Sequence, residues 1–245
     1  MILGSNNYSF RHLEWDTEYF GVKSGKIELF NELTVQDQRE IIEVLDSFEF
    51  TTIYNYFNNN KNNTWIGEIR KASLKDVNVQ FYLRLEEQNH CFAEDSNIII
   101  DNNMDKNDDI IDMASNSFLF SRFFNDEKLN IDKSANIYRQ WVTTAFKQEN
   151  RYFLYYQYRG RTIAFILFNF YDSEATIELI AVNKLNAGKG IGSKMIGYLK
   201  HYLFDRGIEV LKVGTQINNV GAINFYIALG FRYSHCTGVY HYWRS

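Results

Sequence analysis

The chain has 245 residues, a formal net charge of −4 and 45% hydrophobic residues, so it can form one large domain or two small ones, each with a core. The acidic balance disfavours nucleic acid as a partner, because nucleic-acid binders typically present a basic surface. No apolar run reaches the ~18 residues of a membrane helix, and the N-terminus does not resemble a leader, so we expect a cytoplasmic protein without a membrane partner.

The first part of the chain is typical of a small α/β unit. Its predicted elements are a strand over Gly25–Phe30, a helix over Thr34–Phe48 with Thr34 as N-cap, a strand over Thr52–Phe57, a helix from Asn63 or Thr64 to Asp76, and a strand over Val79–Leu85. The polar segment Glu86–His90 breaks the pattern and is the predicted linker. We therefore expect an N-terminal α/β domain over residues 1–93 and a second domain over residues 94–245.

The second part alternates strands and helices in a different order. Its predicted elements are a strand at Ile98–Ile100, helices over Lys106–Phe120 and Ser134–Phe146, a hairpin of Arg151–Tyr158 with Thr162–Tyr171, a strand over Thr176–Val182, a helix over Ser193–Arg206, and strands over Glu209–Thr215 and Phe231–Trp243. We find no internal repeat.

Cysteine and histidine indicate no special chemistry. Cys91 and Cys236 are not paired by their spacing, so we expect buried free thiols. The five histidines show neither metal-ligand nor catalytic-triad spacing; they are His12, His90, His201, His235 and His241. We therefore predict no metal site.

A glycine-rich segment, Gly188-Lys189-Gly190-Ile191-Gly192, lies between a predicted strand and a predicted helix. Glycines at alternate positions let main-chain N–H groups converge at a helix N-terminus, where the helix dipole favours a phosphate. A Walker loop requires Ser or Thr directly after Gly-Lys, and here Gly190 follows. A dinucleotide fingerprint requires its third glycine three positions after the second, and here it is two positions on.

What remains is a resemblance to the acyl-coenzyme A loop of the Gcn5-related N-acetyltransferase (GNAT) superfamily. The chain resembles that loop over Ala187–Gly192, and then shows Asn219-x-x-Ala222, Tyr226 and Gly230-Phe231. One departure is Ala187, where the superfamily prefers Gln or Arg. The resemblance implies a GNAT fold, that is, an α/β (α+β) architecture with a central mixed, mostly antiparallel sheet flanked by helices and preceded here by the smaller N-terminal domain.

The resemblance also implies acetyl-CoA as co-substrate, bound in the gap between two strands that splay apart. The residues expected to bind it are Ile180, Ala181, Val182, Gly188, Lys189, Gly190, Ile191, Gly192, Ser193 and Asn219. The resemblance implies that Tyr226 is the general acid for the departing thiolate. Glu178 is a candidate base, with a water chain as the alternative. Each has a structural alternative: a packed tyrosine, an N-cap for Asn219 and a salt-bridged strand residue for Glu178.

Three further segments resemble the dTDP-fucosamine acetyltransferases. They are Leu13–Val22, Ser121-Arg122-Phe123 with Tyr138–Trp141, and Leu211–Gln216. This resemblance implies an acceptor that is a nucleotide-linked amino sugar of the dTDP-4-amino-4,6-dideoxyhexose type, used in cell-surface polysaccharide biosynthesis and contacted by Ser121, Arg122 and Phe123. A structural arginine and a core phenylalanine remain the alternative for the last two. Another amine acceptor, a non-catalytic acetyl-CoA sensor and a homodimer also stay open.

Overall fold

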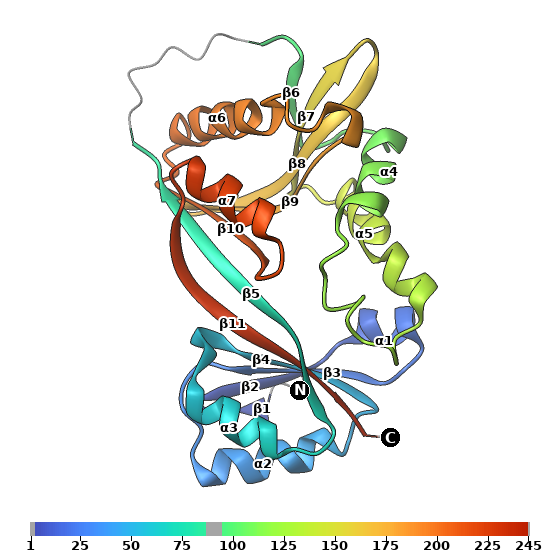
Figure 1. Ribbon diagram of the computed structural model, residues 1–245, viewed down its shortest axis with the longest axis vertical. Coiled ribbons are helices and arrows are strands. Elements are labelled where there is room, and N and C mark those ends of the chain that lie inside the picture. The colour runs from blue at the N-terminus through green and yellow to red at the C-terminus, as the bar shows by residue number, and fades with distance from the viewer. Residues whose placement is uncertain (1–2, 87–94, 245) are drawn as a thin grey trace.

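A computed structural model describes residues 3–86 and 95–244 and shows one continuous sheet of eleven strands with seven α-helices around it (Figure 1). The strands are β1 (Leu3–Gly4), β2 (Tyr8–His12), β3 (Ser24–Leu29), β4 (Phe50–Asn55), β5 (Ala72–Arg84), β6 (Ile98–Asp101), β7 (Tyr152–Tyr158), β8 (Arg161–Tyr171), β9 (Glu174–Val182), β10 (Val210–Gln216) and β11 (Arg232–Trp243). The α-helices are α1 (Glu14–Phe20), α2 (Val35–Leu45), α3 (Asn60–Glu68), α4 (Asp108–Ser117), α5 (Ile131–Ala145), α6 (Ile191–Phe204) and α7 (Val220–Ala228). Short 3₁₀ turns lie at Tyr56–Asn58 and Lys184–Asn186.

The strand order is β1-β2-β3-β4-β11-β5-β10-β9-β8-β7-β6. Among these strands only the pairs β3–β4 and β9–β10 are parallel, and the other neighbours are antiparallel. The predicted mixed, mostly antiparallel sheet flanked by helices is therefore confirmed.

The sheet is nearly symmetric about the antiparallel pair β5–β11. If β3, β4 and β5 are exchanged with β9, β10 and β11, the six central strands keep the same order, read from the opposite edge of the sheet, and the same directions of pairing. The same exchange replaces α2 by α6 and α3 by α7. The two halves thus repeat one strand–helix–strand–helix–strand arrangement, although the sequence predicted no repeat.

Strand pairing crosses the predicted domain boundary at residue 93. β5 precedes that boundary but pairs with β10 over seven residues, and β11 pairs with β4 as well as with β5. The two parts of the chain therefore share one sheet, and the division into residues 1–93 and 94–245 stays a prediction. Most of the proposed linker and Cys91 lie outside the described residues, and Cys236 is a half-buried free thiol.

Side-chain capping explains where α2 and α3 begin. Thr34 caps α2 as predicted, and it forms a capping box in which the Asp37 carboxylate accepts the Thr34 N–H at 2.9 Å. The start predicted for α3 was wrong. The Asn59 side chain accepts the N–H groups of Lys61 and Asn62, so α3 begins at Asn60 and ends at Glu68 rather than near Asp76.

Three apolar clusters hold the sheet in place. One face of the C-terminal half packs against α6 and α7, with Met195 and Leu199 fully buried. The other face packs against α4 and α5, and Phe20 of α1 joins that cluster. The third cluster lies under α2 and α3. The second cluster therefore ties the N-terminal helix α1 to the helices that overhang the sheet centre.

Candidate active site

A cleft opens where β9 and β10 separate. Their parallel ladder ends at Ile177 and Val213. At the same point β9 carries a β-bulge, since Leu167 pairs with Leu179 and Phe168 with Ile177, which leaves Glu178 as the extra residue. Beyond the bulge, none of the described strands pairs with β9 on the side that faces the cleft. The resemblance implied that these two strands separate, and the bulge is the local cause of their separation.

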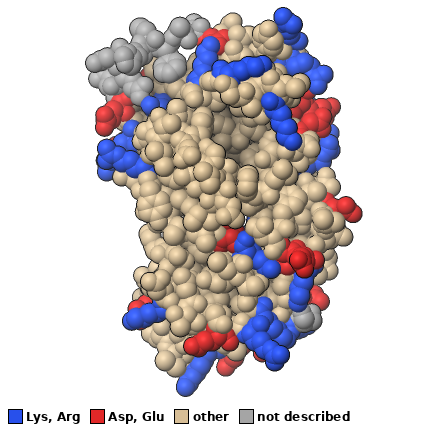
Figure 2. All heavy atoms as spheres, viewed as in Figure 1, with Lys and Arg blue, Asp and Glu red and all other residues tan. Residues whose placement is uncertain are grey.

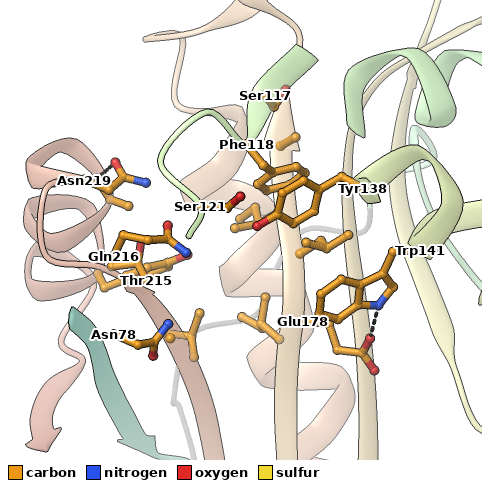
Figure 3. A pocket seen from close by; sticks show the side chains of 18 of the residues that line it. Asn78, Ser117, Phe118, Ser121, Tyr138, Trp141, Glu178, Thr215, Gln216 and Asn219 are labelled. Atoms are coloured by element: carbon orange, nitrogen blue, oxygen red, sulfur yellow. Dashed lines mark hydrogen bonds between the residues drawn. The ribbon is translucent and has the colours of Figure 1, made fainter. Parts of the chain in front are cut away.

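A cavity of 1420 Å³ extends from this cleft toward the N-terminal half. Ile180, Ala181 and Val182 line it from β9, and Gly214, Thr215 and Gln216 line it from β10. Figure 3 shows Thr215, Gln216 and Asn219 on one side of the cavity, with Phe118 and Tyr138 across from them. The face shown in Figure 2 is hollowed in its upper half, among mainly uncharged residues.

The glycine segment forms the loop that enters α6. Gly188 and Gly190 have φ values of 75° and 79°, a left-handed conformation that favours glycine. At Gly192 a Cβ would lie 3.2 Å from the Phe225 ring. Within the described parts of the chain no side chain caps α6, so the first N–H groups of the helix are left for another acceptor.

Most of the predicted coenzyme residues come together around this loop. Gly188, Gly190, Ile191, Gly192, Ser193 and Asn219 all line the cavity. Lys189 does not, because it lies on the exposed surface and its ammonium donates to Asn186 Oδ1 at 3.2 Å. Ala187 lines the cavity but has no side-chain donor to contribute.

Tyr226 and Asn219 reach the cavity from α7. The Tyr226 side chain is 3% exposed and packs among the rings of Phe81, Phe225 and Phe231. Burial raises the pKa of Tyr226 above its ordinary value, so the phenol stays protonated at neutral pH. Asn219 is the N-cap of α7: its Oδ1 accepts the Ala222 N–H at 3.2 Å, and its amide nitrogen points toward the cavity (Figure 3).

Glu178 lies in the cavity wall with its carboxylate already engaged. Its Oε2 accepts the Trp141 indole N–H at 3.0 Å, and its Oε1 accepts the Asn169 amide at 2.6 Å. The Arg151 guanidinium also lies 3.0 Å from Oε1. These three donors fix Glu178 and Trp141 in place, which favours the salt-bridged alternative over a base that must accept a further proton.

The segment between α4 and α5 overhangs the other end of the cavity. Ser121, Arg122 and Phe123, which the resemblance assigns to acceptor binding, all line it. Ser121 is buried next to the Tyr138 hydroxyl (Figure 3). The Arg122 guanidinium lies 4.0 Å from the centre of the Phe123 ring, and that ring stacks on Phe20.

Arg122 is anchored to the N-terminal half of the sheet. Its Nη1 donates to Thr52 Oγ1 at 3.2 Å and lies 3.0 Å from Nε2 of His241. Because a guanidinium can only donate, Nε2 must be the acceptor, so the ring proton is on Nδ1 and is donated to Asp126 Oδ2 at 2.5 Å. Burial lowers the pKa of His241 to about 4, which agrees with a neutral ring. No sequence pattern indicated this chain of contacts.

Residues of the N-terminal half complete this end of the cavity. Trp15 and Asp16 come from α1, Tyr54 from β4, and Asp76 and Asn78 from β5. Sequence reasoning missed Tyr54, Asp76 and Asn78, because they belong to no motif and reach the cavity only through strand pairing across the two halves. No cluster of three or more His, Cys, Asp or Glu side chains within residues 3–86 and 95–244 could hold a metal ion.

Comparisons with known proteins agree with this geometry. Residues 110–231 match the model of the acetyltransferase (GNAT) family. A spore coat polysaccharide biosynthesis protein, SpsD of Bacillus subtilis, is 27% identical over 134 residues, which cover 55% of this chain and 46% of that protein. Streptothricin acetyltransferase of Escherichia coli is 32% identical over 85 residues, covering 29% of this chain and 49% of that protein. The chain thus spans about half the length of these curated relatives.

Among solved structures, a functionally unknown conserved protein from Staphylococcus epidermidis superposes with a TM-score of 0.67 at 14% identity. The match covers 98% of this chain and 91% of that one, so it supports the fold across both halves.

None of the helices in the described parts of the chain is both long and apolar enough to cross a membrane.

Proposed function

We propose a function from the premise that the chain belongs to the acetyltransferase (GNAT) family: it transfers the acetyl group of acetyl-CoA to an amine on a sugar. The expected acceptor is a nucleotide-linked amino sugar of the dTDP-4-amino-4,6-dideoxyhexose type. The observation that carries this proposal is the continuous cavity, which joins the glycine loop of α6 to an acceptor end built by both halves of the sheet.

The cleft suits acetyl-CoA along its whole length. The pyrophosphate would lie on the uncapped N-terminus of α6, where Gly188 and Gly190 keep backbone N–H groups accessible. The pantetheine arm would extend along the unpaired edge of β9 at Ile180–Val182 and exchange amide hydrogen bonds with it. Asn219 would add an amide donor beside that arm. With Ala187 in place of a longer polar residue, the main chain supplies most of the phosphate contacts.

The chemistry would proceed by direct attack within a ternary complex. A backbone N–H of Ala181 or Val182 would polarise the thioester carbonyl, and the amine nitrogen would attack its carbon. As the C–S bond breaks, the Tyr226 hydroxyl would donate its proton to the sulfur. The described residues that line the cavity include no cysteine, so they offer no thiol for an acyl-enzyme intermediate.

The acceptor end suits a sugar with an aromatic or nucleotide neighbour. Trp15, Tyr54, Phe123 and Trp141 provide flat apolar faces, and Arg122 provides a guanidinium held in one orientation by Thr52 and His241. The relative SpsD is named for polysaccharide biosynthesis, which supports a sugar intermediate as the acceptor.

A second acceptor class has its own support. The charged residues that line the cavity in the described parts of the chain are Asp16, Asp76, Glu178 and Arg122, which is an excess of acidic groups. Such a wall attracts a cationic amine more readily than a diphosphate. Streptothricin acetyltransferase, the relative from Escherichia coli, is named for streptothricin as its acceptor. A polyamine or amino-antibiotic acceptor is therefore the alternative to test.

The decisive experiment measures CoA thiol release with acetyl-CoA and each acceptor in turn. The acceptors are dTDP-4-amino-4,6-dideoxygalactose, the same sugar without the nucleotide, spermidine and streptothricin. We expect the highest kcat/KM with the nucleotide-linked sugar. A higher value with streptothricin or spermidine would replace it by the second class. Acetyl-CoA binding measured by calorimetry, without turnover of any acceptor, would instead indicate a sensor.

A further inference from the structure

The acceptor end contains a carboxylate that the proposed chemistry has not used. Asp76 lies on β5, on the same side of the strand as Asn78 and Gln80, and all three line the cavity. Asn78 pairs with Gln216 at the end of β10, directly beside the cleft where the thioester would lie. Asp76 is two residues farther along β5, or about 7 Å, toward the acceptor end.

The surroundings of Asp76 make its carboxylate a suitable proton acceptor. Arg122 from the α4–α5 segment and Tyr138 from α5 interact electrostatically with Asp76, and Tyr54 from β4 and Asp16 from α1 line the same cavity. Among the described residues that line the cavity Arg122 is the one cation, and its guanidinium is shared with Thr52 and His241. Burial outweighs this attraction and raises the pKa of the Asp76 carboxyl to about 6.

The other two carboxylates that line the cavity have more charged or hydrogen-bonding partners. Asp16 interacts with Arg11 and Lys26 in addition to Arg122, and Glu178 is bound by Arg151, Trp141 and Asn169. Within the described parts of the chain, the groups that stabilise the Asp76 carboxylate are Arg122 and the adjacent Val77 N–H. Among the described residues, Asp76 is therefore the cavity carboxylate with the fewest partners, and it lies two residues along β5 from Asn78, which flanks the cleft.

We propose that Asp76 is the general base that removes a proton from the acceptor ammonium group. This role rests on the proposed acetyl transfer and deepens it. The ammonium gives one proton to the Asp76 carboxylate, and the nitrogen lone pair then forms the C–N bond as the C–S bond breaks. Tyr226 donates its proton to the thiolate, and the second proton, which leaves the nitrogen as the amide forms, returns to the Tyr226 phenolate through water. The proton on Asp76 returns to solvent.

The test compares kcat/KM between pH 5 and 9 for the wild type and Asp76→Asn, with the best acceptor of the panel above. Because the carboxylate must be ionised, we expect the wild-type rate to fall about tenfold per pH unit below pH 6. Asp76→Asn should lower kcat/KM by about 100-fold or more at pH 7.5, remove this acidic limb and leave the Kd for acetyl-CoA within twofold. Asp112→Asn, the same change on the exposed side of α4, should match the wild type.

Several outcomes would overturn this role. They are wild-type turnover by Asp76→Asn, loss of the acidic limb in Asp16→Asn instead, or a ¹³C-carboxyl resonance of Asp76 that titrates near pH 4. Should Asp76→Asn fail to bind acetyl-CoA, Asp76→Glu keeps a carboxylate and must keep the acidic limb at a lower rate. Absence of turnover by the wild type with every amine would overturn the proposed function itself.

Discussion

At the scale of single residues, Tyr226 combines a polar group with an apolar shell. Its ring packs among Phe81, Phe225 and Phe231, and the residue lines the cavity. In this environment the phenol does not ionise near neutral pH, because burial raises its pKa. It can therefore act as a donor and not as a base.

We predict that Tyr226→Phe lowers kcat by about 100-fold, because the thiolate then departs without a proton donor. The packing of the ring is kept, so the Kd for acetyl-CoA and the midpoint of thermal unfolding should change little. Stopped-flow CoA release and calorimetry measure the two quantities. Tyr202→Phe, on α6 outside the cavity, is the matched control and should retain full turnover. Equal rates in the two variants would remove Tyr226 as the acid.

The buried His241 predicts a pH effect on stability. Its pKa in the folded protein is about 4, below the ~6.5 expected when unfolded. Between these values only the unfolded chain takes up the proton, so the free energy of unfolding falls as pH falls from 6.5 to 4. Relative to His241→Gln, the free energy of unfolding of the wild type, measured with urea, should fall by up to about 3 kcal/mol between pH 6.5 and pH 4. A difference that does not vary with pH would contradict a neutral His241.

Residues that act locally were the ones predictable from sequence. The glycines of the loop and the caps Thr34 and Asn219 interact with main chain a few positions away, so their spacing carries the information. Asp76 and the pair Arg122–His241 act across more than 100 residues or through strand pairing. Their geometry depends on tertiary contacts that no short pattern records.

At the scale of elements, α2 and α6 occupy equivalent places in the two halves but have different N-termini. α2 has a capping box, and Asp37 places a negative charge in its first turn. Among the described residues, α6 has a left-handed glycine at its N-cap, no side-chain cap and no acidic residue in its first turn. Of the two helices, α6 alone can therefore offer free N–H groups and a positive helix end to a phosphate.

The glycine loop gives a prediction with a close control. Gly188 and Gly160 both have a φ of 75°, and a Cβ added at either position would meet no atom of another described residue within 4 Å, chain neighbours aside. Gly188→Ala and Gly160→Ala should each cost about 1 to 2 kcal/mol of stability, because alanine disfavours left-handed backbone. Only Gly188→Ala should weaken acetyl-CoA binding, by about tenfold or more in calorimetry. Equal affinities in the two variants would argue against the loop as the phosphate site.

At the scale of the whole molecule, the two halves resemble each other in topology but not in chemistry. The segment before α2 contains no glycine, and Ile66 stands on α3 where Tyr226 stands on α7, counted from the N-caps Asn59 and Asn219. A repeat that keeps only apolar patterning is invisible to a search for repeated residues. The described N-terminal half has no loop of this kind and contributes a wall of the cavity instead.

The shared strands give the last prediction. In a fragment of residues 1–93, β4 would lose β11, and β5 would lose both of its neighbours, β11 and β10, which leaves three open strand edges. We therefore expect this fragment and residues 94–245 each to lack a cooperative unfolding transition, while the full chain unfolds in one step. Urea unfolding followed by circular dichroism and by tryptophan fluorescence would show coincident curves for the full chain. A fragment of residues 1–93 that unfolds cooperatively would establish the N-terminal domain predicted from the sequence, with β11 only docking on it.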